Sequence, residues 1–458
     1  MERLVRKLAG GILLSAALLP AAPAGAQSQG TAGGPLTAFL ENIFAKPAPQ
    51  ASLRPPAGGG AVPWSRQHGT SGNPLMTADA IRQAAENFGN CLAAMRPAAA
   101  RRDISPASFE RFTAGVVPDL HIMHLLDAQP EFTRPIWDYL DTLITTDRLA
   151  AGREILAQYK RDFDATERTY GVDRYTLAAI WGIESNFSTE MGDLSVVQST
   201  ATLACIGRRQ PYFRNEFLAA LEILNDGDLT PEEMRGSWAG AFGPTQFMPT
   251  AFLRYAVDAD GDGRRDVVDD PADLLASTAN NLRKDGWRTG RTWGYEVIVP
   301  RRFNYMLADH ARTMTIAGWE RLGIRRAIGR PFPHPADKAY LLLPAGAQGP
   351  AFLMLRNFRV IMKYNPAEAY ALAIGHFADR LRGGGHFVQP WPRQERELSR
   401  FERLELQQLL AERGFYRGAP DGRIGGQTRE ALRRFQASVG VPADGFASAE
   451  VLKRLHGD

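Results

Sequence analysis

The most informative stretch of the sequence is residues 181–187, which places one carboxylate where a predicted helix is otherwise apolar. Glu184 lies seven residues after Leu177 and three after Trp181, so all three share one helical face. Such a carboxylate either has a structural role, as a helix-end cap or the partner of an Arg, or is kept for chemistry. Burial raises the pKa of a carboxyl group and lets it donate a proton near neutral pH. Glu184 is therefore a candidate general acid, and this stretch alone leaves both roles open.

Residues 237–249 combine small residues with hydrogen-bonding and aromatic side chains. Glycines permit close approach of the backbone to a ligand, Ser237 and Gln246 offer polar groups, and three aromatic rings offer apolar faces. That mixture suits a sugar, which has apolar ring faces and a polar rim. A tightly packed turn between helices would have the same composition.

Residues 258–269 match the EF-hand template for calcium binding, with acidic side chains at positions one, three and five and Gly at position six. Position twelve is an Asp, which reaches less far than the usual Glu, so a later Asp is an alternative last ligand. We predict a structural Ca²⁺ ion here, with an empty acidic turn as the alternative. The predicted ligands are Asp258, Asp260, Asp262, the carbonyl of Arg264, Asp269 and Asp273.

The composition indicates a folded protein with room for two or three domains, since 44% of its 458 residues are hydrophobic. The excess of 54 Lys and Arg over 50 Asp and Glu is small, and nothing argues for a nucleic acid partner. No phosphate-binding signature is present, and we predict no organic cofactor.

The first residues predict export. Basic residues precede an apolar run at 8–19, and Ala-Gly-Ala at 24–26 offers a cleavage site, so residues 1–26 read as a signal peptide. No Cys follows that could carry a lipid anchor, and no apolar run is long enough to be a transmembrane segment. We expect a soluble periplasmic protein. In that oxidising compartment Cys91 and Cys205 are predicted to form a disulfide, with two buried free thiols as the alternative.

The remaining chain divides by composition. Residues 27–74 are rich in Gly, Pro and Ala and predict a flexible linker. Residues 75–385 carry mostly helical patterns with few short strand-like runs, such as 295–299. Within them, Asn365 as cap, Pro366 at the first position and Glu368 completing a capping box predict a late helix. A linker at 386–396 then leads to a small helical module at 397–458.

With these motifs assembled, the chain resembles the membrane-bound lytic transglycosylase B family, in a soluble form with a C-terminal peptidoglycan-binding domain. The resemblance covers roughly residues 77–381 and 398–455. It rests on Glu-Ser-x-Phe at 184–187, the stretch 237–249, the acidic loop, and Tyr364-Asn365 ahead of Tyr370. In the module it rests on residues such as Gly414, Asp421-Gly422 and Asp444-Gly445.

The resemblance implies a mainly α fold: a lysozyme-like catalytic domain with an EF-hand-like calcium loop, and a small three-helix peptidoglycan-binding domain. It implies that Glu184 is the single acid/base that cleaves the β-1,4 bond between N-acetylmuramic acid and N-acetylglucosamine and forms 1,6-anhydromuramic acid ends. Tyr370 would help to hold Glu184. The other implied substrate-binding residues are Ser237, Gln246, Tyr364 and Asn365.

The residues agree with a single acid, because an ordinary glycosidase needs two carboxylates and no second one is evident in the cleft-like stretches. One departure is Ser188, where the family usually has Gly. A hydrolytic muramidase and a non-catalytic wall-binding scaffold remain the alternatives. Peptidoglycan glycan strands are the implied partner, and the sequence leaves open whether cell-wall synthesis or division proteins also bind.

Overall fold

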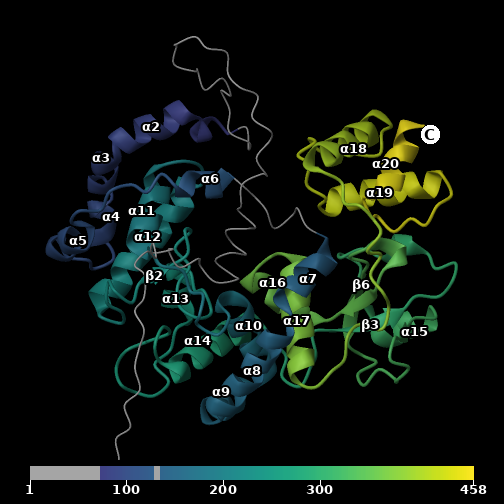
Figure 1. The fold of residues 1–458 in the computed structure, drawn as a ribbon, viewed down its shortest axis with the longest axis horizontal. Helices are drawn as coiled ribbons and strands as arrows, with labels where there is room; N and C mark the ends of the chain where they lie inside the picture. The colour runs from purple at the N-terminus through teal and green to yellow at the C-terminus, as the bar shows by residue number, and fades with distance from the viewer. Residues whose placement is uncertain (1–72, 128–134, 458) are drawn as a thin grey trace, which may run out of the picture.

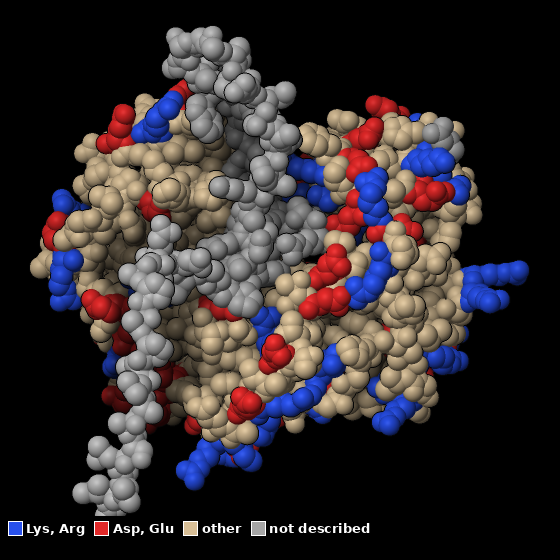
Figure 2. Space-filling view, viewed as in Figure 1, with Lys and Arg blue, Asp and Glu red and all other residues tan. Residues whose placement is uncertain are grey.

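The computed structural model describes residues 73–127 and 135–457. The predicted signal peptide, and all but the last two residues of the predicted linker at 27–74, lie outside the described residues. Within the described part, no helix is long and apolar enough to cross a membrane. On the face shown in Figure 2, positive and negative side chains are interspersed.

Helices make up most of the described chain, which confirms the predicted mainly α fold (Figure 1). One group packs around a core formed largely by α11, α12 and α13. Its helices are α2 (Ala78–Glu86), α3 (Phe88–Ala93), α4 (Arg96–Ala100), α5 (Pro106–Thr113), α6 (Ile122–Asp127), α11 (Val196–Cys205), α12 (Gln210–Asp226) and α13 (Pro249–Tyr255).

A second group surrounds α10, the helix that carries Glu184. Its members are α7 (Ile136–Leu143), α8 (Thr146–Gln158), α9 (Lys160–Tyr170), α10 (Arg174–Ser185), α14 (Pro271–Lys284), α16 (Arg356–Tyr364) and α17 (Glu368–Leu381). Helix α10 packs against α17, and Gly182 makes the close approach possible. A Cβ atom on Gly182 would lie 2.7 Å from the ring of Phe377 and 2.6 Å from that of Phe187.

An antiparallel sheet lies between α14 and α16 in the chain, with the strand order β4-β6-β7-β3-β5. Its strands are β3 (Gly294–Ile298), β4 (Met314–Thr315), β5 (Arg325–Arg326), β6 (Lys338–Leu342) and β7 (Ala351–Met354). Of these, only β3 corresponds to a strand-like run singled out in the sequence. Strand β7 is buried on both faces: Phe352 joins the core around α10, and Leu353 joins a core that includes residues of α15 (Ile316–Arg321). The sheet therefore lacks the clean alternation that would have made it visible in the sequence.

The C-terminal residues form the predicted three-helix module, with its own core around Leu406, Leu410 and Leu432. The helices are α18 (Arg400–Glu412), α19 (Gly426–Ser438) and α20 (Ala449–His456). Two buried glutamines hold its two Asp-Gly turns. Gln407 bonds the side chain and backbone of Asp421, and Gln436 bonds the side chain of Asp444 and the N–H of Gly445.

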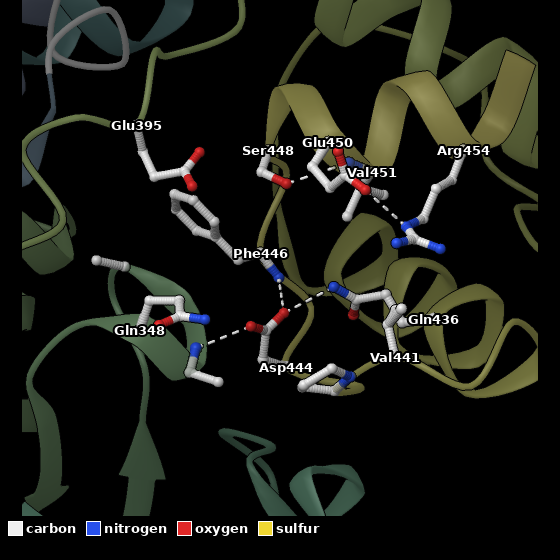
Figure 3. A pocket seen from close by; sticks show the side chains of 13 residues that line it. Gln348, Glu395, Gln436, Val441, Asp444, Phe446, Ser448, Glu450, Val451 and Arg454 are labelled. Carbon is white, nitrogen blue, oxygen red and sulfur yellow. Dashed lines mark hydrogen bonds and ion pairs between the residues drawn. The ribbon is translucent and has the colours of Figure 1, made fainter. Parts of the chain in front are cut away.

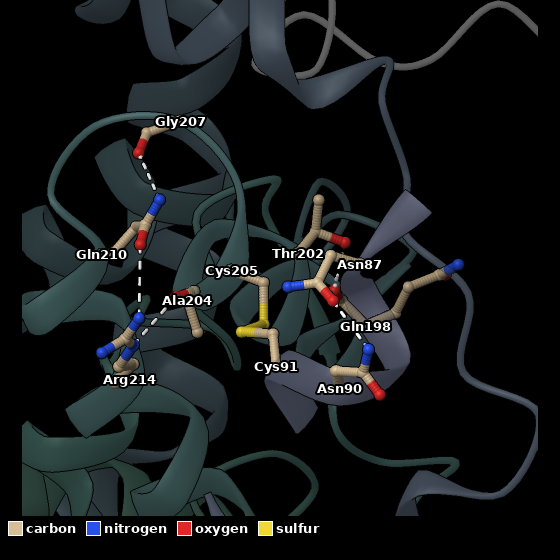
Figure 4. Close-up of a disulfide and its surroundings, with 10 residues drawn as sticks. All are labelled: Asn87, Asn90, Cys91, Gln198, Thr202, Ala204, Cys205, Gly207, Gln210 and Arg214. Atoms are coloured by element: carbon tan, nitrogen blue, oxygen red, sulfur yellow. Dashed lines mark hydrogen bonds between the residues drawn. A yellow bond between two sulfur atoms is a disulfide. The ribbon is translucent and has the colours of Figure 1, made fainter. Parts of the chain in front are cut away.

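Cys91 and Cys205 form a disulfide that fastens α3 to the end of α11 (Figure 4). The bond closes a sequence separation of 114 residues. It ties the N-terminal helices to the first helical core.

The predicted start of α17 at Pro366 is wrong by two residues, since the helix begins at Glu368. Asn365 has extended backbone, and its side chain accepts the N–H of Ala367 at 3.1 Å. The Asn thus closes a local turn instead of capping the helix. Glu368 does not reach back to the cap either, because its carboxylate faces the C-terminal module.

Candidate active site

Glu184 lies in the last turn of α10, partly exposed among residues that are almost all buried. The hydroxyl of Tyr370, on α17, donates to its Oε1 at 2.5 Å. Burial raises the pKa of Glu184 to about 7, and the Tyr370 hydrogen bond opposes the rise only in part. Among the described residues Glu184 forms no ion pair, so the pairing with an Arg considered above is not what the structure contains. A carboxyl group in this state can both give and take a proton near neutral pH.

The chain turns sharply after Glu184. Asn186, Phe187 and Ser188 have consecutive φ angles of 48°, 57° and 72°, in the left-handed region that costs a residue with a side chain roughly 1 kcal/mol. Ser185 holds the turn: its hydroxyl donates to the carbonyl of Pro244 at 2.6 Å and accepts the N–H of Ser188 at 3.0 Å. The turn is thereby fastened to the stretch 237–249.

Ser188, the departure from the family's Gly, adopts the left-handed conformation that Gly would favour. Its hydroxyl accepts the indole N–H of Trp181 at 2.9 Å. A buried indole N–H needs such a partner, so the side chain offsets part of the backbone strain.

A second support of this turn was not predicted. The guanidinium of Arg148 is buried and donates from Nε to Asn186 Oδ1 at 3.1 Å and from Nη1 to the carbonyl of Leu143 at 2.7 Å. Asn186 in turn donates to Glu190 Oε1 at 3.0 Å. Nothing in the sequence signals these contacts, because Arg148 and Asn186 lie 38 residues apart.

In the stretch 237–249 the polar groups make contacts within the protein. Ser237 Oγ accepts the N–H of Ala241 at 3.1 Å. Gln246, at φ 54°, donates from Nε2 to the carbonyls of Met191 and Gly243 at 3.0 and 2.9 Å. The stretch thus has the tight-turn structure that its composition allowed, and contact with a sugar stays a prediction for both residues.

Tyr364, at the end of α16, joins this stretch to Glu184. Its hydroxyl donates to the carbonyl of Thr245 at 2.5 Å, and its ring contacts that of Phe247. Burial raises the pKa of Tyr364, and the charge of Glu184 raises it further. The pKa of Tyr370 is raised by the same two causes, in the same order. Both phenols are therefore neutral at physiological pH.

The structure brings together Glu184, Tyr370, Tyr364 and the stretch 237–249, with Asn365 beside Tyr364. Among the described residues, no other carboxylate contributes to the shift in the pKa of Glu184. A partner carboxylate at the spacing of an ordinary retaining glycosidase would raise that pKa through its charge. The geometry fits one acid that works without a carboxylate nucleophile.

The acidic loop lies between α13 and α14. Asp258, Asp260 and Asp262 each offer one oxygen, and these oxygens lie within 4.8 Å of one another. The carboxylate of Asp258 also accepts the N–H groups of Gly261 at 2.6 Å and Gly263 at 2.9 Å. Three hard oxygen ligands on a loop folded in this way fit a calcium ion.

The other two predicted acidic ligands do not belong to this group of three aspartates. Asp269 groups with Asp266 and Glu233, and the sequence reasoning missed both of these residues. Asp273 is buried, and its two oxygens accept the N–H groups of Ala259 at 2.6 Å and Asp266 at 2.7 Å. Asp273 therefore clamps both ends of the loop.

The side chain of Arg264 points away from the three aspartates. Its guanidinium donates to the carbonyl of Asp228 and lies 3.1 Å from Glu233. Only its backbone carbonyl is left to serve as a ligand, which is the role that the EF-hand template gives to position seven.

The sequence matches two known protein families and several known proteins. The transglycosylase SLT domain family matches residues 87–379, and the peptidoglycan binding domain family matches residues 400–455. Membrane-bound lytic murein transglycosylase B of Escherichia coli (strain K12) is 29% identical over 237 residues, which are 52% of this chain and 64% of that protein. The match thus spans slightly less than two thirds of that relative's length.

Solved structures share the fold over longer spans. The crystal structure of SltB3 from Pseudomonas aeruginosa in complex with NAG-anhNAM-pentapeptide is 46% identical, with a TM-score of 0.78, and the match covers 81% of this chain and 99% of that one. The structure of the Escherichia coli lytic transglycosylase Slt35 in complex with calcium is 25% identical, with a TM-score of 0.55, over 65% of this chain and 92% of that one. Since the first family covers well over half of the residues, the chain belongs to the transglycosylase SLT domain family.

Proposed function

We propose that this protein is a lytic murein transglycosylase, which cleaves the β-1,4 bond between N-acetylmuramic acid and N-acetylglucosamine in peptidoglycan. The observation that carries the proposal is the state of Glu184: one carboxyl group with a pKa of about 7, held by a neutral phenol. The family match supports it, as do the relative named lytic murein transglycosylase B and the similar structure of SltB3 in complex with NAG-anhNAM-pentapeptide.

The proposed reaction uses the one carboxyl group twice. Protonated Glu184 gives its proton to the glycosidic oxygen as the bond from that oxygen to C1 of the muramic sugar breaks. The resulting carboxylate then takes the proton of the sugar's 6-hydroxyl, whose oxygen bonds to C1. The product is a 1,6-anhydro ring, no water is consumed, and Glu184 ends protonated for the next turn.

The neighbouring residues have supporting roles in this proposal. Tyr370 fixes the direction of the carboxyl group and limits the rise of its pKa. Tyr364 holds the turn at Thr245 in place. Ser237, Gln246 and Asn365 contact the sugars through the groups that their internal hydrogen bonds leave available.

The C-terminal module and the acidic loop complete the proposal. The module holds the enzyme on peptidoglycan, which fits its family match and a periplasmic location. Asp258, Asp260 and Asp262, with the carbonyl of Arg264, bind a structural Ca²⁺ ion. The calcium complex of the related Slt35 supports this assignment. The proposed reaction assigns no step to calcium.

Digestion of purified murein by the wild type and by Glu184→Gln tests the chemistry. We expect the wild type to release muropeptides that end in 1,6-anhydromuramic acid, one water lighter than hydrolysed ones by mass spectrometry, and the variant to release almost none. Reducing ends in place of anhydro ends would indicate a hydrolytic muramidase. Absence of any product from a correctly folded wild type would indicate a wall-binding scaffold.

A further inference from the structure

The C-terminal module is docked on the catalytic part at several points. Asp444, held within the module by Gln436, accepts the N–H of Ala347 at 2.8 Å (Figure 3). The contact is close, since a Cβ atom on Gly346 would lie 2.7 Å from the Asp444 carboxylate. Arg433, which is buried, donates to the carbonyl of Ala308 at 3.0 Å. These contacts hold the module, including one face of α19, against the catalytic part.

Arg429, on the same helix, reaches the first residue of α17. Its Nη1 donates to both oxygens of Glu368, at 2.9 and 3.2 Å. His310 Nδ1 lies 3.1 Å from Glu368 Oε1. The Glu368 side chain is only 18% exposed. Burial would raise the pKa of Glu368, but the charges of Arg429 and His310 outweigh it and hold that pKa below its usual value.

Glu368 and the residue that holds the acid share one helical turn. Helix α17 begins at Glu368, and Tyr370 is its third residue. The hydroxyl of Tyr370 donates to Glu184. The segment between α16 and α17, from Asn365 to Ala367, is non-helical, so the side chains of the first turn of α17 help to hold that turn in place. The side chain of Glu368 contacts Arg429 of the module, and the side chain of Tyr370 contacts Glu184.

We propose that Arg429 is a positioning residue for the active site: through Glu368 it fixes the first turn of α17, and through Tyr370 it fixes Glu184. The proposal rests on the transglycosylase function proposed above. It gives the C-terminal module a second task beside wall binding, because the catalytic carboxyl group is correctly placed only when the module is docked.

Loss of Arg429 has a defined physical consequence. Among the described residues, the Glu368 carboxylate would keep His310 as its remaining polar contact, and burial, the largest cause, lowers the pKa of that imidazole and so disfavours its charged form. A carboxylate that is largely buried and has lost its cation moves toward water. That movement shifts the first turn of α17 and weakens the hydrogen bond from Tyr370. A misplaced catalytic group costs up to about 100-fold in rate.

The experiment measures the full chain on a short, soluble glycan, so that retention on the wall plays no part. Arg429→Ala and Glu368→Gln are compared with Arg429→Lys, which keeps the charge. The matched control is Arg434→Ala, because Arg434 lies on the same helix and, within the described part of the chain, donates to the carbonyl of Phe415 of the module and not to the catalytic part. Thermal unfolding and retention on sacculi are recorded for each variant.

We expect Arg429→Ala and Glu368→Gln to lower kcat about tenfold with little change in KM. The basic limb of the pH profile should move to higher pH, because the Tyr370 bond lowers the pKa of Glu184. The groups facing Glu184, Tyr370 and Tyr364, stay neutral in this range and do not obscure the limb. Arg429→Lys should recover part of the rate, and Arg434→Ala should match the wild type.

A double variant distinguishes positioning from general destabilisation. If Arg429 acts through Tyr370, adding Arg429→Ala to Tyr370→Phe lowers kcat little further. The proposal is overturned if the folded Arg429→Ala and Glu368→Gln variants have the same kcat and the same basic limb of the pH profile as Arg434→Ala. It is also overturned if the fold-losses in kcat of Arg429→Ala and Tyr370→Phe multiply in the double variant. If Arg429→Ala does not fold, the kcat and the pH profile of Glu368→Gln and Arg429→Lys test the proposal in its place. Failure of the proposed function is a separate result, since the wild type would then give no anhydro product.

Discussion

Two carboxylate sites in this protein show how surroundings decide what the same chemical group can do. Among the described residues Glu184 accepts one hydrogen bond, from a neutral phenol, and it lies partly exposed beside an apolar core, where burial raises its pKa to about 7. Asp258 is exposed and accepts two backbone N–H groups, which lower its pKa. The first group is held ready to exchange a proton, and the second is held as an anion. The difference fits catalysis at Glu184 and cation binding at the acidic loop.

The largest expected effect tests the proton exchange at Glu184. Glu184→Gln keeps the shape of the side chain but cannot donate or accept the proton, so kcat should fall by about 1,000-fold or more. Product analysis by mass spectrometry measures the loss. If the variant keeps a tenth of the wild-type kcat, Glu184 is not the general acid/base.

The same variant carries a stability prediction with a definite sign. The pKa of Glu184 in the folded protein, about 7, lies above its ordinary value of 4.5. Ionisation therefore opposes folding, with a cost that is absent below about pH 4.5 and complete above about pH 7. Glu184→Gln should raise the stability at pH 8 relative to the wild type more than at pH 4, as measured by urea unfolding at both values.

Tyr370→Phe tests what holds the acid in place. The variant loses the donor to Glu184, so the pKa of Glu184 should rise further and the basic limb of kcat/KM should move to higher pH. Because orientation is lost too, kcat should fall about tenfold. Tyr364→Phe is the matched control, since its hydroxyl donates to the carbonyl of Thr245 and not to Glu184. An unchanged pH limb in Tyr370→Phe would show that the bond does not tune the acid.

Calcium removal tests the proposed cation site in the acidic loop. A ligand present at about 100 times its Kd stabilises the folded state by about 2.7 kcal/mol, so chelation should lower Tm by about 5 °C. Asp260→Asn should reduce this shift, and kcat well below Tm should stay near that of the calcium-loaded protein. Calorimetry with Ca²⁺ and Mg²⁺ gives the selectivity. No shift of Tm and no heat at millimolar calcium would leave the loop as an acidic turn.

The smallest effect is expected at Ser188. Ser188→Gly relieves the left-handed strain but removes the acceptor of the Trp181 indole N–H, and the two changes are each about 1 kcal/mol. The net change in unfolding free energy should therefore stay within about 1 kcal/mol, with kcat little altered. A large fall in kcat would mean that the Ser188 hydroxyl positions the turn after Glu184.

Much of this architecture could be predicted from the sequence. The spacing of Leu177, Trp181 and Glu184 placed the carboxylate on a buried helical face, and the composition of 237–249 allowed a tight turn as one of its two interpretations. The spacing of the aspartates predicted a folded acidic loop. These signals are local: each rests on residues within about a dozen positions of one another, where helical periodicity and turn chemistry act directly.

The tertiary structure decided what depends on residues far apart in the chain. Strand β7 is buried on both faces and gives no alternating pattern, so the sheet went largely unpredicted. Asp269 and Asp273 were both candidates for the last calcium ligand in the sequence, yet only the fold turns Asp273 into a clamp and groups Asp269 with Glu233.

The sequence by itself determined the acid, its helix and the family to which the chain belongs. The fold decided the state of that acid, because the apolar surroundings and the Tyr370 hydroxyl that set its pKa come from distant segments, Tyr370 lying 186 residues away. It also decided that α19 of the C-terminal module reaches α17 through Arg429. The reason is physical: a pKa and an ion pair depend on distances in space, and a sequence gives only distances along the chain.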